Sequence, residues 1–133
     1  MKIALGVTGG VAAYKAAELV RRLQQEKLDV QVVMTRSAQE FITPLTFAAL
    51  TGQKVITDMF SAAGSAPANV ESAIEHIAVA QRIDLLLVAP ATADILGKFA
   101  HGIAEEELLL GLLEYSLPEV PEGTLDKDGK RRK

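Results

Sequence analysis

Short apolar runs alternate with amphipathic stretches along most of the chain. The apolar runs at 3–7, 28–34 and 83–88 are typical of β-strands, and IDLLLV at 83–88 predicts a strand buried on both faces. Between the first two runs, residues Val11 to Glu26 have helical spacing. The apolar stripe of this helix is Ala12, Ala16, Leu19, Val20 and Leu23. A helix that connects two strands predicts that the strands are parallel.

Turn-forming residues mark the ends of the remaining elements. Ser37 is expected to cap a short helix at 38–42. A second helix, from Pro44 to Leu50, has Thr43 as its expected cap and stops at Gly52. The other predicted elements are helices at 70–80, 94–100 and 105–115 and a short edge strand at 55–56.

These elements predict an α/β fold with a doubly wound parallel sheet, Rossmann-like and layered α/β/α. In this topology the first strand and the strand at 83–88 are neighbours. The strand order reverses between them, so a crevice is expected at their carboxyl ends. A single domain is expected over 1–117, and the charged segment 118–133 is expected to be a disordered tail.

Two turns rich in small residues would face that crevice. The first, at 8–12, contains Gly9 and Gly10 and precedes a helix, whose free N–H groups and dipole suit a phosphate. The second turn lies at 89–94. The first turn matches neither the dinucleotide fingerprint G-x-G-x-x-G nor the P-loop, so its spacing does not identify a ligand. A tight strand-to-helix turn without a ligand is the alternative interpretation.

The composition of the chain argues against several classes of function. It has 133 residues, 49% of them hydrophobic, and no apolar run approaches the roughly 18 residues of a membrane-spanning helix. A net charge of -3 and few aromatic residues give no basis for nucleic-acid binding. Cysteine is absent, which excludes disulfides and thiolate metal sites in this chain and fits a cytoplasmic protein. No metal site is predicted.

Four stretches together resemble the homo-oligomeric flavin-containing cysteine decarboxylase family. They are GVTGGVAAYK at 6–15, VVMTRSAQEFI at 32–42, IEHI at 74–77 and APATADILGKFAHGIAEEELL at 89–109. The similarity is greatest to the phosphopantothenoylcysteine decarboxylase branch of the family. It implies an FMN-dependent enzyme that converts the small molecule 4'-phosphopantothenoylcysteine to 4'-phosphopantetheine in coenzyme A biosynthesis. It also implies a homotrimer, or a dodecamer built from trimers.

The resemblance implies which residues hold FMN. Its phosphate is expected at the first turn and the end of the second strand, at Thr8, Gly9, Gly10, Val11, Thr35 and Ser37. The flavin ring is expected against Pro90, Ala91, Thr92, Ala93 and Asp94. The small side chains of this second set would let the ring lie close to the backbone. Asp94 stands where many relatives have asparagine.

One histidine is implied to be catalytic. His76 matches the essential histidine of the family, which would take the thiol proton of the substrate or orient its carboxylate while the flavin oxidises the thiol. Without the resemblance, a packed or surface helix histidine is the commoner interpretation. His101 is expected to interact with a helix C-terminus, and Lys98 to be a solvated helix residue.

The resemblance ends after about residue 110. Relatives continue with a Pro-Ala-Met-Asn segment that binds the substrate carboxylate and a flap with a reactive cysteine, and neither motif occurs in this sequence. A non-catalytic FMN-binding subunit or regulatory module is therefore the alternative to a decarboxylase. The IEHI and PATAD stretches disfavour a flavin prenyltransferase, and a nucleotide-binding α/β protein without flavin stays open.

Overall fold

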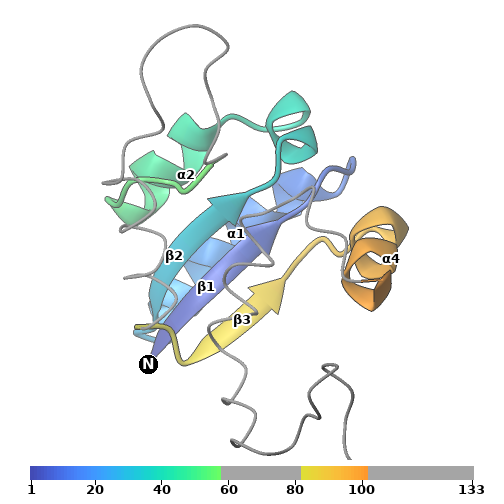
Figure 1. The fold of residues 1–133 in the computed structure, drawn as a ribbon. Helices are drawn as coiled ribbons and strands as arrows, with labels where there is room; N and C mark the ends of the chain where they lie inside the picture. Colours follow the sequence, from blue (N-terminus) through green and yellow to red (C-terminus); the bar gives the residue numbers. More distant parts are fainter. Residues whose placement is uncertain (58–81, 102–133) are drawn as a thin grey trace, which may run out of the picture.

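A parallel three-stranded sheet forms the centre of the computed structural model, which describes residues 1–57 and 82–101. The strands are β1 (Lys2–Val7), β2 (Asp29–Met34) and β3 (Leu85–Val88), in the order β2-β1-β3 (Figure 1). Both neighbours of β1 run parallel to it. The predicted α/β class is therefore confirmed, and so is the expectation that the strand at 83–88 lies beside the first strand.

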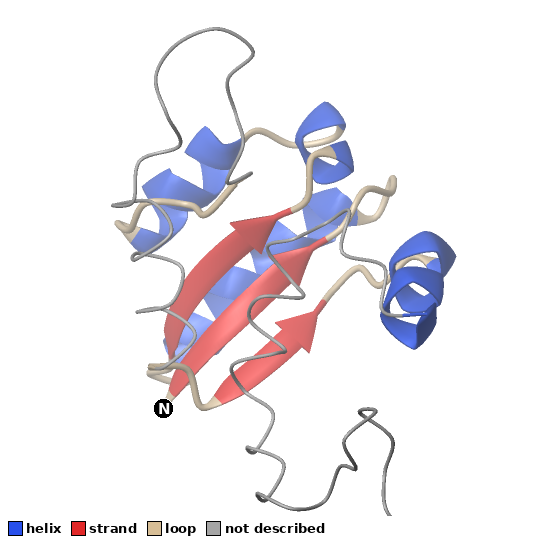
Figure 2. Ribbon diagram, in the orientation of Figure 1, coloured by secondary structure: helices blue, strands red, loops and turns tan. Residues whose placement is uncertain are grey.

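Helices flank this sheet (Figure 2). They are α1 (Ala13–Gln25), a 3-10 helix (Ser37–Glu40), α2 (Pro44–Thr51) and α4 (Ala93–His101). Each begins within two residues of its expected start, because apolar spacing and turn residues mark these boundaries locally. The predicted strand at 55–56 is reduced to a parallel bridge between Ile56 and Val33 on the outer side of β2.

One face of the sheet packs against α1 and α2. Alternate strand residues point to this face, as the two-residue period of a strand requires. The buried side chains gathered here include Leu5, Val7, Val30, Val32, Met34, Ala13, Ala16, Val20 and Phe47. Of the predicted helix stripe, Ala12 is exposed and the neighbouring Ala13 is buried instead, because the helix begins at Ala13.

The opposite face carries a second, smaller apolar cluster. Val33 and Ile95 are its buried members, and Ile95 comes from α4. The partly buried side chains that pack against them are Ile56, Ile83, Leu86, Val88 and Phe99. Apolar side chains therefore pack on both faces of the sheet, as expected for a doubly wound α/β fold.

β3 is less buried than its sequence predicts. Leu85 is 46% exposed, and the other three residues of the strand are half-buried. Within the described residues β3 pairs with β1 alone, so its other edge has no neighbouring strand there. The prediction of full burial was wrong because strand order, which the run IDLLLV does not encode, decides how much of the strand is covered.

Two glycines allow the effect of backbone conformation to be measured without steric contacts. A Cβ built on Gly97, within α4, or on Gly52, at the end of α2, would meet no atom within 4 Å. Gly52 has a φ of 67°, in the left-handed region, whereas Gly97 is helical. We expect Gly97→Ala to raise the free energy of unfolding by about 0.5–1 kcal/mol and Gly52→Ala to lower it by about 1 kcal/mol. Urea denaturation measures both, and shifts of the same sign would contradict the expectation.

Several predicted segments lie outside the described residues. They are the helices at 70–80 and 105–115 and the tail at 118–133. Among the helices within 1–57 and 82–101, none combines the length and the apolar character that crossing a membrane requires.

Candidate functional site

The turn after β1 is joined to the turn after β3 through the hydroxyl of Thr8. This hydroxyl donates a hydrogen bond to the carbonyl oxygen of Pro90 and accepts one from the backbone N–H of Thr92 at 3.3 Å. Thr8 is only 1% exposed, so the bonds are shielded from water. The predicted convergence of the two small-residue turns on one place, at the carboxyl ends of adjacent parallel strands, is confirmed.

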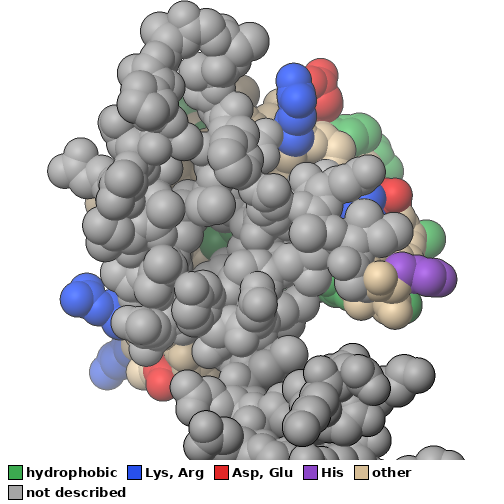
Figure 3. Space-filling view, viewed as in Figure 1, with side chains coloured by type: hydrophobic (Ala, Val, Ile, Leu, Met, Phe, Trp, Pro, Cys, Tyr) green, Lys and Arg blue, Asp and Glu red, His purple; other side chains and the backbone are tan. Residues whose placement is uncertain are grey.

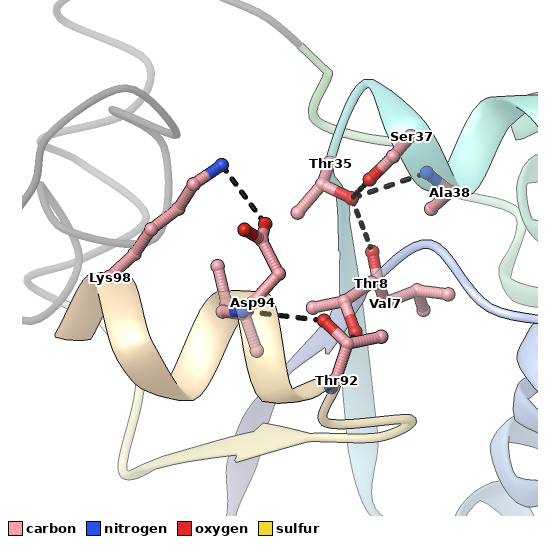
Figure 4. A network of polar contacts seen from close by, with 9 residues as sticks. Val7, Thr8, Thr35, Ser37, Ala38, Thr92, Asp94 and Lys98 are labelled. Carbon is pink, nitrogen blue, oxygen red and sulfur yellow. Dashed lines mark hydrogen bonds and ion pairs between the residues drawn. The ribbon is translucent and has the colours of Figure 1, made fainter. Parts of the chain in front are cut away.

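The end of β2 joins the same place through Thr35. Its N–H donates to the Val7 carbonyl at 3.1 Å, and its hydroxyl lies 3.2 Å from the hydroxyl of Ser37 (Figure 4). The hydroxyl of Thr35 also accepts a hydrogen bond from the N–H of Ala38 at 3.2 Å. Ser37 was expected to cap this 3-10 helix, but it lies inside the helix and the Thr35 hydroxyl binds its first turn instead. The Ser37 side chain is left exposed at the site.

Gly9 brings the first turn against the end of β2. A Cβ on Gly9 would lie 2.5 Å from Cβ and Oγ of Ser37 and 2.7 Å from its backbone carbonyl carbon. Real Cβ atoms do not come so close to atoms to which they are not bonded. A Cβ on Gly10 would lie 3.6 Å from Cγ2 of Thr92, an ordinary contact. Gly9 is therefore required by close approach to Ser37, within the chain itself, and Gly10 is not required in this way.

The two helix N-termini at the site differ in how they are satisfied. α1 begins after Ala12, without a side-chain cap and without an acidic residue in its first turn. In α4, Oγ1 of Thr92 accepts a hydrogen bond from the N–H of Ile95 at 3.3 Å, and Asp94 lies in the first turn. Alanine is a poor capping residue and a helix N-terminus attracts negative charge. An anion therefore fits at α1, beside the exposed Ser37 hydroxyl, and not at α4.

The carboxylate of Asp94 pairs with a lysine one turn later. Nζ of Lys98 lies 3.1 Å from Oδ2 of Asp94, and the Lys98 side chain is 18% exposed against 72% for Asp94. Lys98 was expected to be a solvated helix residue, and its side chain is instead partly buried. His101 fulfils its predicted role, since its Nδ1 donates to the carbonyl oxygen of Gly97 in the last turn of α4 at 2.8 Å. His101 is exposed, and a histidine is visible at the surface in Figure 3.

The described residues include all the predicted cofactor contacts and leave out the predicted catalytic residue. The eleven contacts lie on the three turns that converge. His76 lies outside the described residues. Sequence interpretation missed the ion pair of Lys98 with Asp94, although their i,i+4 spacing on one helix was a usable signal. Within the described residues, no group of three His, Cys, Asp or Glu side chains is arranged to hold a metal ion.

Comparison with known families identifies the family of the chain. Residues 1–114 match the Flavoprotein family. The chain belongs to the Flavoprotein family. The turns that carry the site all lie within the matched residues of this flavoprotein.

Curated relatives of the chain include bifunctional proteins of coenzyme A biosynthesis. The coenzyme A biosynthesis bifunctional protein CoaBC of Vibrio vulnificus is 44% identical over 117 residues, which are 88% of this chain and 28% of the relative. CoaBC of Bacillus subtilis is 44% identical over 116 residues, covering 87% of this chain and 27% of the relative. The chain thus spans about a quarter of the length of these relatives.

Solved structures similar to the flavoprotein include decarboxylases. The FMN-dependent cysteine decarboxylase SpaF matches with a TM-score of 0.70 and 27% identity, over 88% of this chain and 63% of SpaF. HAL3 from Cryptococcus neoformans matches with a TM-score of 0.66 and 27% identity, over 90% of this chain and 65% of HAL3. The flavoprotein therefore shares the Rossmann-like fold of FMN-dependent cysteine decarboxylases.

Proposed function

We propose that this chain carries the FMN site of a decarboxylase that converts 4'-phosphopantothenoylcysteine to 4'-phosphopantetheine in coenzyme A biosynthesis. The names of the CoaBC relatives and of SpaF support the pathway and the cofactor. The observation that carries the proposal is the uncapped N-terminus of α1, which lies near the exposed hydroxyl of Ser37 because Gly9 lets the turn approach the end of β2 closely. Free N–H groups and a hydroxyl are the donors that a phosphate accepts from.

The proposal divides the site residues into ligands and supports. The backbone N–H groups of Gly9, Gly10 and Val11 and the hydroxyl of Ser37 would hold the phosphate. The hydroxyls of Thr8 and Thr35 are already engaged within the chain, so they would hold the turns in place. The residues proposed to face the flavin ring are Pro90, Ala91, Thr92, Ala93 and Asp94.

The catalytic part of the proposal rests on family resemblance. When bound, FMN would supply the oxidant for the substrate thiol, and oxidation next to the carboxylate makes that carboxylate labile. His76 is proposed to take the thiol proton or to orient the carboxylate. A neutral imidazole serves either role near pH 7, because its ordinary pKa lies close to that pH.

Assembly and location complete the proposal. We place the activity in the cytoplasm and in a homotrimer, alone or within a dodecamer. Large apolar side chains that are exposed in the single chain support an assembly, in which they would be covered. The large apolar side chains that are exposed on α1, α2 and the residues preceding them are Val11, Tyr14, Phe41 and Leu45.

Cofactor binding is the first test of the proposal. The purified chain, with and without added FMN, is examined for flavin absorption, and the pigment released by heat is identified as FMN or FAD. Decarboxylation of 4'-phosphopantothenoylcysteine is then compared between the wild type and His76→Asn. Bound FMN with turnover lost in His76→Asn supports the decarboxylase. Bound FMN without turnover by the wild type supports a non-catalytic flavin-binding module, and no flavin at high FMN overturns both.

A charge placed at the start of α1 tests the phosphate position. Ala12 is exposed and precedes the helix, so both Asp and Asn can be accommodated there. We expect Ala12→Asp to weaken FMN binding about tenfold through repulsion of the phosphate, and the neutral, equally sized Ala12→Asn to change it little. Titration of flavin fluorescence measures both affinities. Riboflavin, which lacks the phosphate, should bind the two variants equally, and a preference of riboflavin for Ala12→Asn would contradict the placement.

A further inference from the structure

Lys98 and Asp94 form an ion pair whose two members are exposed to very different degrees. Their charged atoms are 3.1 Å apart, yet the Lys98 side chain is 18% exposed and the Asp94 side chain 72%. Keeping an ammonium group largely out of water costs free energy unless negative charge compensates it. Asp94 supplies such compensation, one helical turn toward the N-terminus, in the favourable order for an i,i+4 pair.

The pair lies at the rim of the site described above. Asp94 follows Thr92, the residue that caps α4 and is bound to Thr8. Figure 4 shows the Asp94 and Lys98 side chains leaving α4 on the same side, which is also the side where Thr35 and Ser37 lie. Both side chains of the pair therefore leave α4 on the side where the other turns converge.

An unbalanced aspartate at this rim would oppose flavin chemistry. A flavin gains negative charge on two-electron reduction near neutral pH, and a nearby carboxylate raises the free energy of that charged state by Coulomb repulsion. A cation within 4 Å of the carboxylate cancels most of its field at distances longer than their separation.

We propose that Lys98 is a charge-compensating residue that keeps the carboxylate of Asp94 from opposing reduction of the bound flavin. This inference rests on the proposed FMN site. Lys98 acts through Asp94 and is therefore a positioning residue, not a catalytic one. Because Lys98 offsets the charge of Asp94, the pair has no net charge. In this respect it is like the neutral asparagine that the resemblance implies at this position in many relatives.

The midpoint potential of bound FMN in four proteins tests this role. Lys98→Met is expected to lower the potential, by about 30 mV for a tenfold shift in a two-electron equilibrium. Asp94→Asn is expected to raise the potential, because it removes a negative charge that disfavours the reduced flavin. The double variant Asp94→Asn/Lys98→Met should return close to the wild-type potential, and Lys98→Arg, which keeps the charge, should match the wild type. If Lys98→Met does not fold, Asp94→Asn alone decides, and an unchanged potential overturns the inference.

Arg22→Met is the matched control. Arg22 forms an i,i+4 ion pair with Glu18 on α1, with Nη2 of Arg22 2.6 Å from Oε1 of Glu18 and both side chains exposed. Removing the Arg22 charge should leave the midpoint potential of FMN unchanged. A purely structural role for Lys98 would lower the melting temperature without moving the potential of the remaining folded protein, and that outcome overturns the inference alone. If the wild type binds no flavin, the proposed function fails and the inference fails with it.

Discussion

Gly9→Ala is expected to weaken FMN binding about tenfold or more and to lower the free energy of unfolding by about 1–3 kcal/mol. The added Cβ would lie 2.5 Å from the Cβ and Oγ atoms of Ser37 and 2.7 Å from its carbonyl carbon. Rotation of the Ser37 side chain relieves one of these contacts but not those with Cβ and the backbone. The first turn must therefore move away from the end of β2, which separates the groups proposed to bind the phosphate.

Gly10→Ala is the control for this substitution. Its added Cβ would meet only Cγ2 of Thr92 at 3.6 Å, a normal contact, in the same turn and one residue away. Fluorescence titration with FMN and urea denaturation, applied to both variants, give the comparison. Equal losses in the two variants would show that the turn needs glycine for a reason other than the approach to Ser37.

Phe47→Ala is expected to lower the free energy of unfolding by about 3–5 kcal/mol. Phe47 is 0% exposed and is the one buried residue of α2, where it packs into the cluster shared by α1 and the sheet. Removing the ring takes away apolar contacts and leaves a cavity that the surrounding helices fill only in part. Because small domains are stable by only about 5–15 kcal/mol, a large fraction of the total is lost.

Phe41→Ala provides the matched comparison, because Phe41 is the same residue type and is 54% exposed. Urea denaturation of the two variants should show a change of less than about 1 kcal/mol for Phe41→Ala. A comparable loss in both variants would mean that the Phe41 side chain is buried in solution, as it would be in an assembly. Measurement at several protein concentrations separates that case from a monomer.

Elements with a local signal were predicted well from the sequence. The period of apolar residues identified β1, β2 and α1, and the turn residues Pro44 and Gly52 marked the ends of α2. The neighbouring positions of β1 and β3 followed from the known topology of doubly wound sheets. These predictions needed no knowledge of contacts between distant residues.

Features that depend on tertiary contacts were not predicted. Gly9 was expected only as part of a turn that suits a phosphate, and the structure shows that Ser37, just after β2, lies close against it. The exposure of Leu85 depends on what pairs with β3, and the burial of Lys98 depends on how α4 packs. The Thr35 hydroxyl, and not that of Ser37, is the partner of the 3-10 helix, through the N–H of Ala38 three residues later, which is the local spacing of a side-chain cap. His76 remains a prediction.

The hydroxyl of Thr8 has a consequence for how the protein folds. It bonds to Pro90, 82 residues away, so the two halves of the site meet only after a long loop of chain has closed. Contacts of such long sequence separation form slowly compared with the pairing of β1 and β2 through α1. A chain released early in synthesis would hold the phosphate turn without the turn proposed to face the ring. Binding of the cofactor should therefore coincide with the pairing of β3 with β1. The time course of flavin binding during refolding would then report when that pairing forms.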